Sequence, residues 1–139
     1  MELKTGLIGK KDMLVTDEMT AKHVGSGELA VFATPYLAAL VESAAMEAIK
    51  ECLSSEETTV GTKLSLSHVS ATPVSMRVWA EAELTEIDRR CLSFHVSAYD
   101  EAGLIGEGTH ERFVVLKDKF MAKTNDKIKV DGGNHGNGH

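Results

Sequence analysis

The chain has 139 residues, 42% apolar and 26% charged, with a formal net charge of −6 and a pI near 5.5. This length and composition predict one globular domain that buries roughly two-thirds of its unfolded surface. The negative charge argues against a nucleic-acid or anionic-membrane partner, so an anionic ligand needs a local cationic or helix-terminal pocket. The N-terminus lacks the apolar run of a signal peptide, and no stretch approaches the roughly 18 apolar residues of a membrane span. We therefore expect a cytoplasmic protein.

The first 33 residues give only weak local signals. Residues 1–20 predict a short extended lead-in, with 13–15 and 19–21 as weak strand candidates. Residues 25–28 carry two glycines and predict a flexible connection.

Residues 34–53 predict the one long helix of the chain. Thr34 suits the N-cap and Pro35 the first helical position, where a missing N–H costs nothing. Apolar residues recur at the three- and four-residue spacing of one buried helix face. They are Leu37, Leu40, Val41, Ala44, Ala45, Ala48 and Ile49.

From Thr59 onward the hydrophobic period changes to two, which predicts strands. Segments 59–68, 76–85, 92–98 and 104–116 alternate in this way and are separated by turn residues. Long strands joined by short turns pair antiparallel. We expect one α+β domain over residues 1–123 and a flexible C-terminal tail over 124–139.

A long, Ala-rich helix covered by an antiparallel sheet of about five strands resembles the hot-dog fold. The other sheet face would carry Trp79 and Tyr99 on a solvated surface or a partner contact. By analogy with that fold we expect a homodimer formed through an edge strand. Cys52 and Cys91 form no CxxC pair and are interpreted as free thiols, with no metal site expected.

Three residues are candidates for chemistry. Thr34, Glu42 and His68 bring a hydroxyl, a carboxylate and an imidazole to places where burial is expected, as a nucleophilic or general-base site requires. Each also has a structural interpretation: Thr34 as an N-cap, Glu42 as a solvated helix residue and His68 as a hydrogen-bonded core residue. The N-terminus of the helix, with its free N–H groups and partial positive charge, could also polarise a substrate carbonyl or stabilise an oxyanion.

Two further segments suggest a pocket. Gly61 stands at the entrance of the first long strand, and Gly106 and Gly108 interrupt the last one, which indicates close approach of a ligand or another backbone. Arg112 is interpreted either as an ion-pair partner of Glu107 or Glu111, or as a pocket residue for a polar or anionic group.

Four segments resemble the fluoroacetyl-CoA thioesterase family of hot-dog enzymes, within a resemblance that runs from about Val31 to Lys123. They are Phe32–Glu42, Gly61–His68, Ala71–Pro73 and Gly106–Arg112. The resemblance implies hydrolysis of a small acyl-CoA, with Thr34, Glu42 and His68 as the catalytic residues. It further implies Gly61 and Arg112 in the acyl pocket, no metal or cofactor, and coenzyme A as part of the substrate.

The resemblance does not extend to the aromatic lid that covers the acyl pocket in the family, because residues 25–29 contain no aromatic. In the implied mechanism His68 is the general base and Glu42 orients it, with Thr34, Glu42 or water as the nucleophile. Non-catalytic acyl-CoA binding, a hydratase and a dimeric scaffold are the competing functions. The phosphates of coenzyme A need cationic partners, and the candidates, which the sequence does not rank, are Arg77, Arg89, Arg90 and Lys117.

Overall fold

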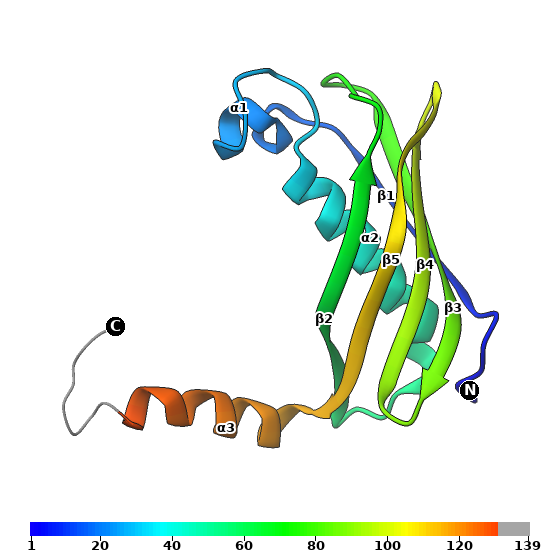
Figure 1. Cartoon of the computed structure of the whole chain (residues 1–139), viewed down its shortest axis with the longest axis vertical. Helices are drawn as coiled ribbons and strands as arrows, with labels where there is room; N and C mark the ends of the chain where they lie inside the picture. Colours follow the sequence, from blue (N-terminus) through cyan, green and yellow to red (C-terminus); the bar gives the residue numbers. More distant parts are fainter. Residues whose placement is uncertain (131–139) are drawn as a thin grey trace.

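A long helix packs across one face of a five-stranded antiparallel sheet in the computed structural model, which describes residues 1–130 (Figure 1). The strands are β1 (Ile8–Leu14), β2 (Glu57–His68), β3 (Arg77–Asp88), β4 (Cys91–Asp100) and β5 (Gly103–Leu116). The helices are α1 (Ala21–Val24), α2 (Thr34–Ile49) and α3 (Lys117–Val130), with short 3₁₀ turns η1 (Asp17–Met19) and η2 (Lys50–Cys52). The sheet order is β1-β3-β4-β5-β2. The predicted α+β hot-dog architecture is confirmed.

The core lies between α2 and the inner face of the sheet. All seven apolar residues predicted for the buried helix face are buried. The alternate apolar positions of β3 and β4 are buried as well; they are Val78, Ala80, Ala82, Leu84, Leu92, Phe94, Val96 and Ala98. Met76, which begins the same alternation in the sequence, lies before β3 and is only half-buried. The alternation in the sequence therefore identified the correct face of both central strands.

Strand β1 was mispredicted in its bounds. It begins at Ile8, whereas the sequence suggested weak strands at 13–15 and 19–21. Gly9 and Lys11 break its apolar alternation, yet both are on the inner side of the ladder with β3. Gly9 is pressed against the backbone of Ala44 and Ala48, where a Cβ atom would have no room. The position of β1 is therefore determined by backbone contact with α2, which the alanines allow, and not by burial of its own side chains.

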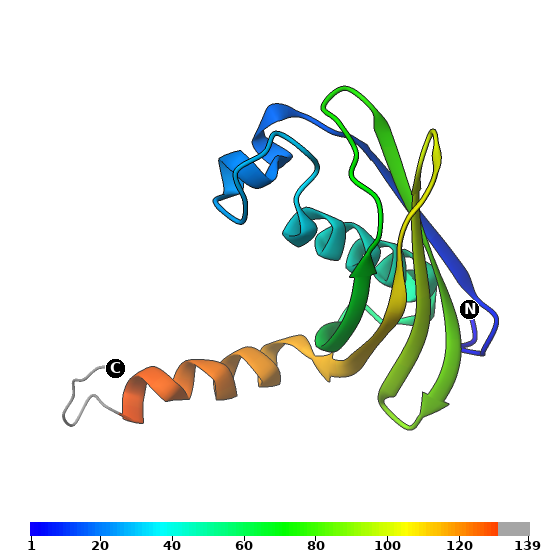
Figure 2. The same cartoon turned by 45° about the horizontal axis from the view of Figure 1, so that its top comes forward.

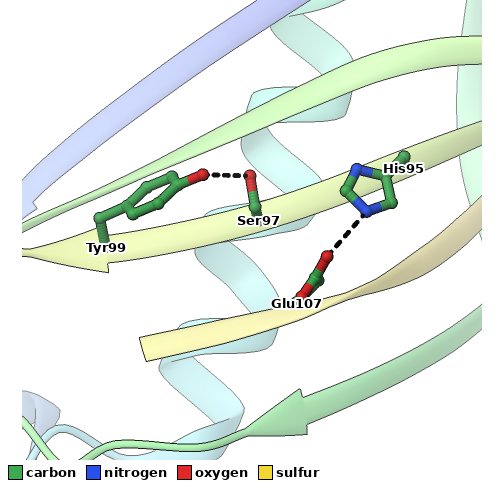
Figure 3. A network of polar contacts seen from close by, with 4 residues as sticks. All are labelled: His95, Ser97, Tyr99 and Glu107. Carbon is green, nitrogen blue, oxygen red and sulfur yellow. Dashed lines mark hydrogen bonds and ion pairs between the residues drawn. The ribbon is translucent and has the colours of Figure 1, made fainter. Parts of the chain in front are cut away.

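The outer face of the sheet is polar. Figure 3 shows His95, Ser97 and Tyr99 of β4 and Glu107 of β5 on the side away from α2. His95 Nε2 lies 3.2 Å from Glu107 Oε2, and both side chains are about half exposed. The rings of Trp79 and Tyr99 stack with their centroids 6.0 Å apart. Water screens this histidine–carboxylate pair, so we assign it to the solvated surface rather than to a reactive site.

Strand β2 is an edge of the sheet. It pairs with β5 only, over Glu57–Leu116 to His68–Gly106, and within residues 1–130 no strand covers its other side. A bulge at Thr62 interrupts the ladder, because Gly61 is paired with Arg112 and Lys63 with Glu111. The backbone groups on the open side of β2 are therefore free to pair with another chain.

Helix α3 leaves the end of β5 and extends away from the sheet on the side of β2 (Figures 1 and 2). The sequence predicted a flexible tail from residue 124, but residues 124–130 are helical. In α3 as a whole, the lysines together with Met121 and Ala122 favour helix even without a buried face, and residues 124–130 continue that helix without the apolar period that marked α2. The rest of the predicted tail, 131–139, lies outside the described residues. Within residues 1–130 no helix has the length and hydropathy needed to span a membrane.

Candidate active site

Thr34 and His68 meet at one end of β2. Thr34 Oγ1 lies 2.7 Å from His68 Nδ1, so a hydrogen bond joins the start of α2 to the last residue of β2. Thr34 is not the N-cap that the sequence predicted. Ala33 holds that position with an extended backbone, and Thr34 is already helical. Its hydroxyl is therefore not engaged in capping and is free to reach His68.

The segment after His68 is fixed by buried hydrogen bonds. Val69 N–H donates to the Ile105 carbonyl at 2.8 Å, and Phe32 N–H donates to the Thr72 carbonyl at 2.8 Å. Thr72 is fully buried, and its hydroxyl donates to Asp100 at 2.7 Å. Residues 71–73, whose Pro73 forms an isolated bridge with Val31, thus tie the region before α2 to the sheet and position His68 beside Thr34.

The imidazole of His68 is partly buried, and its Nε2 atom is buried without a hydrogen-bond partner among the described residues. Burial lowers the pKa of His68 below its ordinary value, and a hydrogen-bonding interaction with the backbone of Ser70 raises it by a smaller amount. That interaction does not give the Nε2 atom a hydrogen-bond partner. The ring is therefore neutral at pH 7. If the Thr34 hydroxyl donates to Nδ1, the ring proton sits on Nε2 and points at no acceptor.

A cleft of about 320 Å³ opens beside this pair. It is lined by Ala21, Ser26, Val31 and Phe32 before α2, by Thr34, and by the residues from His68 to Ala71. The residues before α2 thus do line the cleft, as a lid would. Ser26 stands there in the segment that carries no aromatic residue.

Glu42 lies in a different polar cluster, with Gly61, His110 and Arg112. A Cβ atom on Gly61 would be 3.2 Å from Glu42 Oε2, 3.2 Å from His110 Cε1 and 3.3 Å from an Arg112 Nη1. The missing side chain at Gly61 therefore leaves a small space that these three groups share. The carboxylate of Glu42 makes no hydrogen bond or ion pair with any described residue.

Arg112 is held rigidly at the back of this cluster. Its Nε donates to Thr59 Oγ1 at 2.8 Å and its Nη2 to the Thr59 carbonyl at 3.0 Å. Burial lowers the pKa of Arg112, and the charge of Glu42 offsets part of that effect. The alternative that Arg112 pairs with Glu107 or Glu111 is wrong, because both carboxylates are on the outer face while Arg112 points inward.

His110 completes the cluster, although no role was predicted for it from the sequence. It is buried; its Nδ1–H donates to the Lys63 carbonyl at 2.8 Å, and its Nε2 accepts from Arg112 Nη1 at 3.1 Å. Burial lowers the pKa of His110, and the charge of Arg112 acts in the same direction, so the ring stays neutral. The two-residue spacing of His110 and Arg112 on an inward face was the sequence signal for this contact.

The three predicted catalytic residues do not form one trio within a single chain. Along α2, Thr34 and Glu42 are separated by about 12 Å of helix rise. Along β2, Gly61 beside Glu42 and His68 beside Thr34 are roughly 20 Å apart. The structure brings together Thr34 with His68, and Glu42 with Gly61 and Arg112, as two separate clusters.

Comparison with known proteins assigns the chain to a family. The family model described as fluoroacetyl-CoA-specific thioesterase matches residues 15–118. A curated fluoroacetyl-CoA thioesterase from Streptantibioticus cattleyicolor is 38% identical over 122 residues, which cover 84% of this chain and 88% of that protein.

Solved structures agree. A mutant of the fluoroacetyl-CoA-specific thioesterase FlK, in complex with fluoroacetate and CoA, superposes with a TM-score of 0.80 at 34% identity, covering 85% of this chain and 99% of that one. A thioesterase superfamily member from Thermus thermophilus superposes with a TM-score of 0.87 at 26% identity, covering 94% and 97%. The chain therefore belongs to the fluoroacetyl-CoA-specific thioesterase family and is a thioester hydrolase.

Proposed function

We propose that this protein hydrolyses a small acyl-CoA thioester at a site that two copies of the chain build together, with Thr34 and His68 from one copy and Glu42 from the other. One observation carries the proposal. The buried Nε2 of His68 has no acceptor and the carboxylate of Glu42 has no donor within residues 1–130, although each is the natural partner of the other.

The open edge of β2 offers a way to join the two half-sites. An antiparallel pair of β2 strands centred on Ser65 puts Leu64 opposite Leu66 of the partner subunit, both on the inner face. The bulge at Thr62 then lets Gly61 fall opposite the partner's His68, again on the inner face. In this arrangement Glu42, which lies beside Gly61, reaches the His68 ring of the other copy.

The chemistry follows from the two contacts of the imidazole. His68 takes a proton at Nδ1 from the Thr34 hydroxyl, or from a water that Thr34 orients, while the partner's Glu42 accepts the Nε2–H and balances the charge. The oxygen bonds to the acyl carbon, the carbon–sulfur bond breaks, and the thiol of coenzyme A leaves with the proton. If the Thr34 oxygen attacks, a water activated by His68 then cleaves the acyl–Thr34 ester and restores the hydroxyl, so in either route water supplies the second oxygen of the acid product. We expect no metal or prosthetic group to take part.

Two features of the structure limit where the oxyanion and the acyl group sit. Only the N–H of Thr34 is free to stabilise an oxyanion at the start of α2, since Pro35 has none and Tyr36 N–H bonds to the Ala33 carbonyl. The space over Gly61, next to Arg112, suits a small acyl group with an electronegative substituent. The fluoroacetyl group of the relatives is one candidate, and short acyl groups are the class we propose.

A mixing experiment tests the shared site. His68→Ala and Glu42→Ala chains are each expected to be inactive, but in refolded mixtures the heterodimers regain one intact site, giving about a quarter of wild-type activity under random pairing. Free thiol release from a panel of acyl-CoA esters is the readout, with the dimer mass measured by light scattering. Two inactive variants that stay inactive when mixed would refute the shared site, and a wild-type protein that binds acyl-CoA without turnover would refute hydrolysis.

A further inference from the structure

We propose that a cationic pocket between the β3–β4 turn and the first turns of α3 binds the phosphates of the adenine nucleotide of the acyl-CoA, an inference that rests on the proposed function. Arg90, Lys119, Phe120 and Lys123 line this pocket over the side chains of Val115 and Leu116, and its volume is about 270 Å³. It therefore combines three positive charges, one aromatic ring and an apolar floor.

The charges of this pocket are not neutralised by any residue that the structure describes. None of Arg90, Lys119 and Lys123 forms an ion pair with a described residue, and no described acidic residue lines the pocket. A second pocket on the outer sheet face gives the contrast. There Lys10 lies 3.7 Å from Glu81, and Asp12 is itself a lining residue. Of these two pockets, the one at α3 therefore carries the larger number of unpaired cations and no described acidic lining residue.

The charge distribution along the chain points the same way. Helix α3 carries the five lysines 117, 119, 123, 127 and 129 against Asp118 and Asp126, a net charge of +3 in a chain whose net charge is −6. A chain of that overall charge repels an anionic substrate except where cations are concentrated. Two candidate phosphate cations are engaged elsewhere, since Arg77 pairs with Asp12 and Arg89 with Asp88, whereas Arg90 is free among the described residues.

The shape of the pocket fits a nucleotide better than a free anion. The guanidinium of Arg90 can hold a phosphate with two parallel hydrogen bonds, and the two lysines add point charges on the other side. Phe120 is partly exposed at the rim, where an adenine can stack on its ring. Val115 and Leu116 supply apolar contact to the same base.

The pocket serves the active site of the other copy. Within one chain it adjoins Leu116, which pairs with Glu57 at the start of β2, while His68 is the last residue of that strand. These ends are about 36 Å apart, which exceeds the length of an extended pantetheine arm. In the antiparallel pair of β2 strands, the pocket of one copy lies near the Thr34–His68 pair of its partner, so the substrate spans the interface.

The test compares ligands with and without phosphates. The variant carrying Arg90→Gln, Lys119→Gln and Lys123→Gln should bind adenosine 3′,5′-bisphosphate about tenfold more weakly or worse in calorimetry. Its KM should rise by a similar factor for the best acyl-CoA of the panel, with kcat unchanged, while the KM for the matching acyl-pantetheine stays constant. The matched control, Lys10→Gln with Lys11→Gln, should change neither quantity.

The other possible results of these measurements also decide whether this pocket binds the phosphates of the acyl-CoA. Unchanged bisphosphate affinity in the triple variant overturns the proposal, as does an equal rise in KM for acyl-CoA and acyl-pantetheine. Inorganic phosphate competing as well as the bisphosphate reduces the pocket to a simple anion site and also overturns it. Calorimetry needs no turnover, so loss of bisphosphate binding in the variant upholds the pocket even if the wild-type protein hydrolyses none of the esters and the proposed function fails.

Discussion

The two ends of β2 hold polar clusters of opposite character. At one end, Thr34 and His68 share a single hydrogen bond beside an open cleft, and one ring nitrogen is unpaired. At the other end, Arg112 and His110 are buried and held by Thr59 and by the backbone at Lys63. In the proposed mechanism this difference separates two tasks: the reactive groups stay accessible to substrate, while the groups of the acyl pocket are held in place before it binds.

The largest expected effect is at the open end. His68→Ala should lower kcat by about two to four orders of magnitude, since a general base is lost. Thiol release from the best acyl-CoA measures it, and circular dichroism serves as a control for folding. Turnover close to wild type would show that His68 is not the general base. The Thr34–His68 cluster would then have no catalytic role to distinguish it from the buried cluster of Arg112 and His110.

At the closed end, Gly61→Ala tests whether the space over that residue holds the acyl group. The new methyl would sit 3.2–3.3 Å from Glu42, His110 and Arg112, which is tight but short of a clash with backbone. We expect kcat/KM to fall by about ten- to a hundredfold with little change in melting temperature, because positions shift by fractions of an ångström in the site. Equal activity would place the acyl group elsewhere.

His110 offers a test of rigidity. His110→Ala leaves one donor of Arg112 and the Lys63 carbonyl without their partners, so the free energy of unfolding should fall by about 1–3 kcal/mol. Urea denaturation measures this, and His95→Ala on the solvated outer face is the matched control, expected within about 0.5 kcal/mol of wild type. A larger loss in the control would contradict the distinction between the buried and exposed histidines.

The smallest effect is a displacement of the pH profile. A general base must be unprotonated. Burial lowers the pKa of His68, whereas the carboxylate of the partner's Glu42 in the proposed site raises it, so Glu42→Gln should move the acid limb of the residual kcat/KM to lower pH. In both proteins activity is lost as the pH falls through the pKa of His68 in the folded protein. An acid limb at the same pH in the variant would show that Glu42 does not act on the His68 ring.

The sequence predicted the elements better than the site. Apolar alternation was enough for α2 and for the inner faces of β3 and β4, because burial imposes that period directly. The contact of Thr34 with His68 was expected from the family resemblance, and not from a local pattern, because the two residues stand at the first position of α2 and the last position of β2. The position of Glu42 did not follow, because its distance from His68 depends on the tilt of α2 against β2, which no local pattern encodes. β1 was misplaced because contact with the α2 backbone, and not side-chain burial, defines it.

The bulge in β2 has a consequence for insertions and deletions. Thr62 is the extra residue of the ladder, and its hydroxyl donates to the Glu111 carbonyl at 3.2 Å. Deleting Thr62 alone would give a regular strand in which Gly61, Leu64 and His68 still face α2, since the alternation resumes on the same side. Deleting any residue from Lys63 to Ser67 would instead turn everything between that point and Gly61 outward, and the chain would lose one of its two half-sites. Natural length variation in this strand should therefore concentrate at that single position.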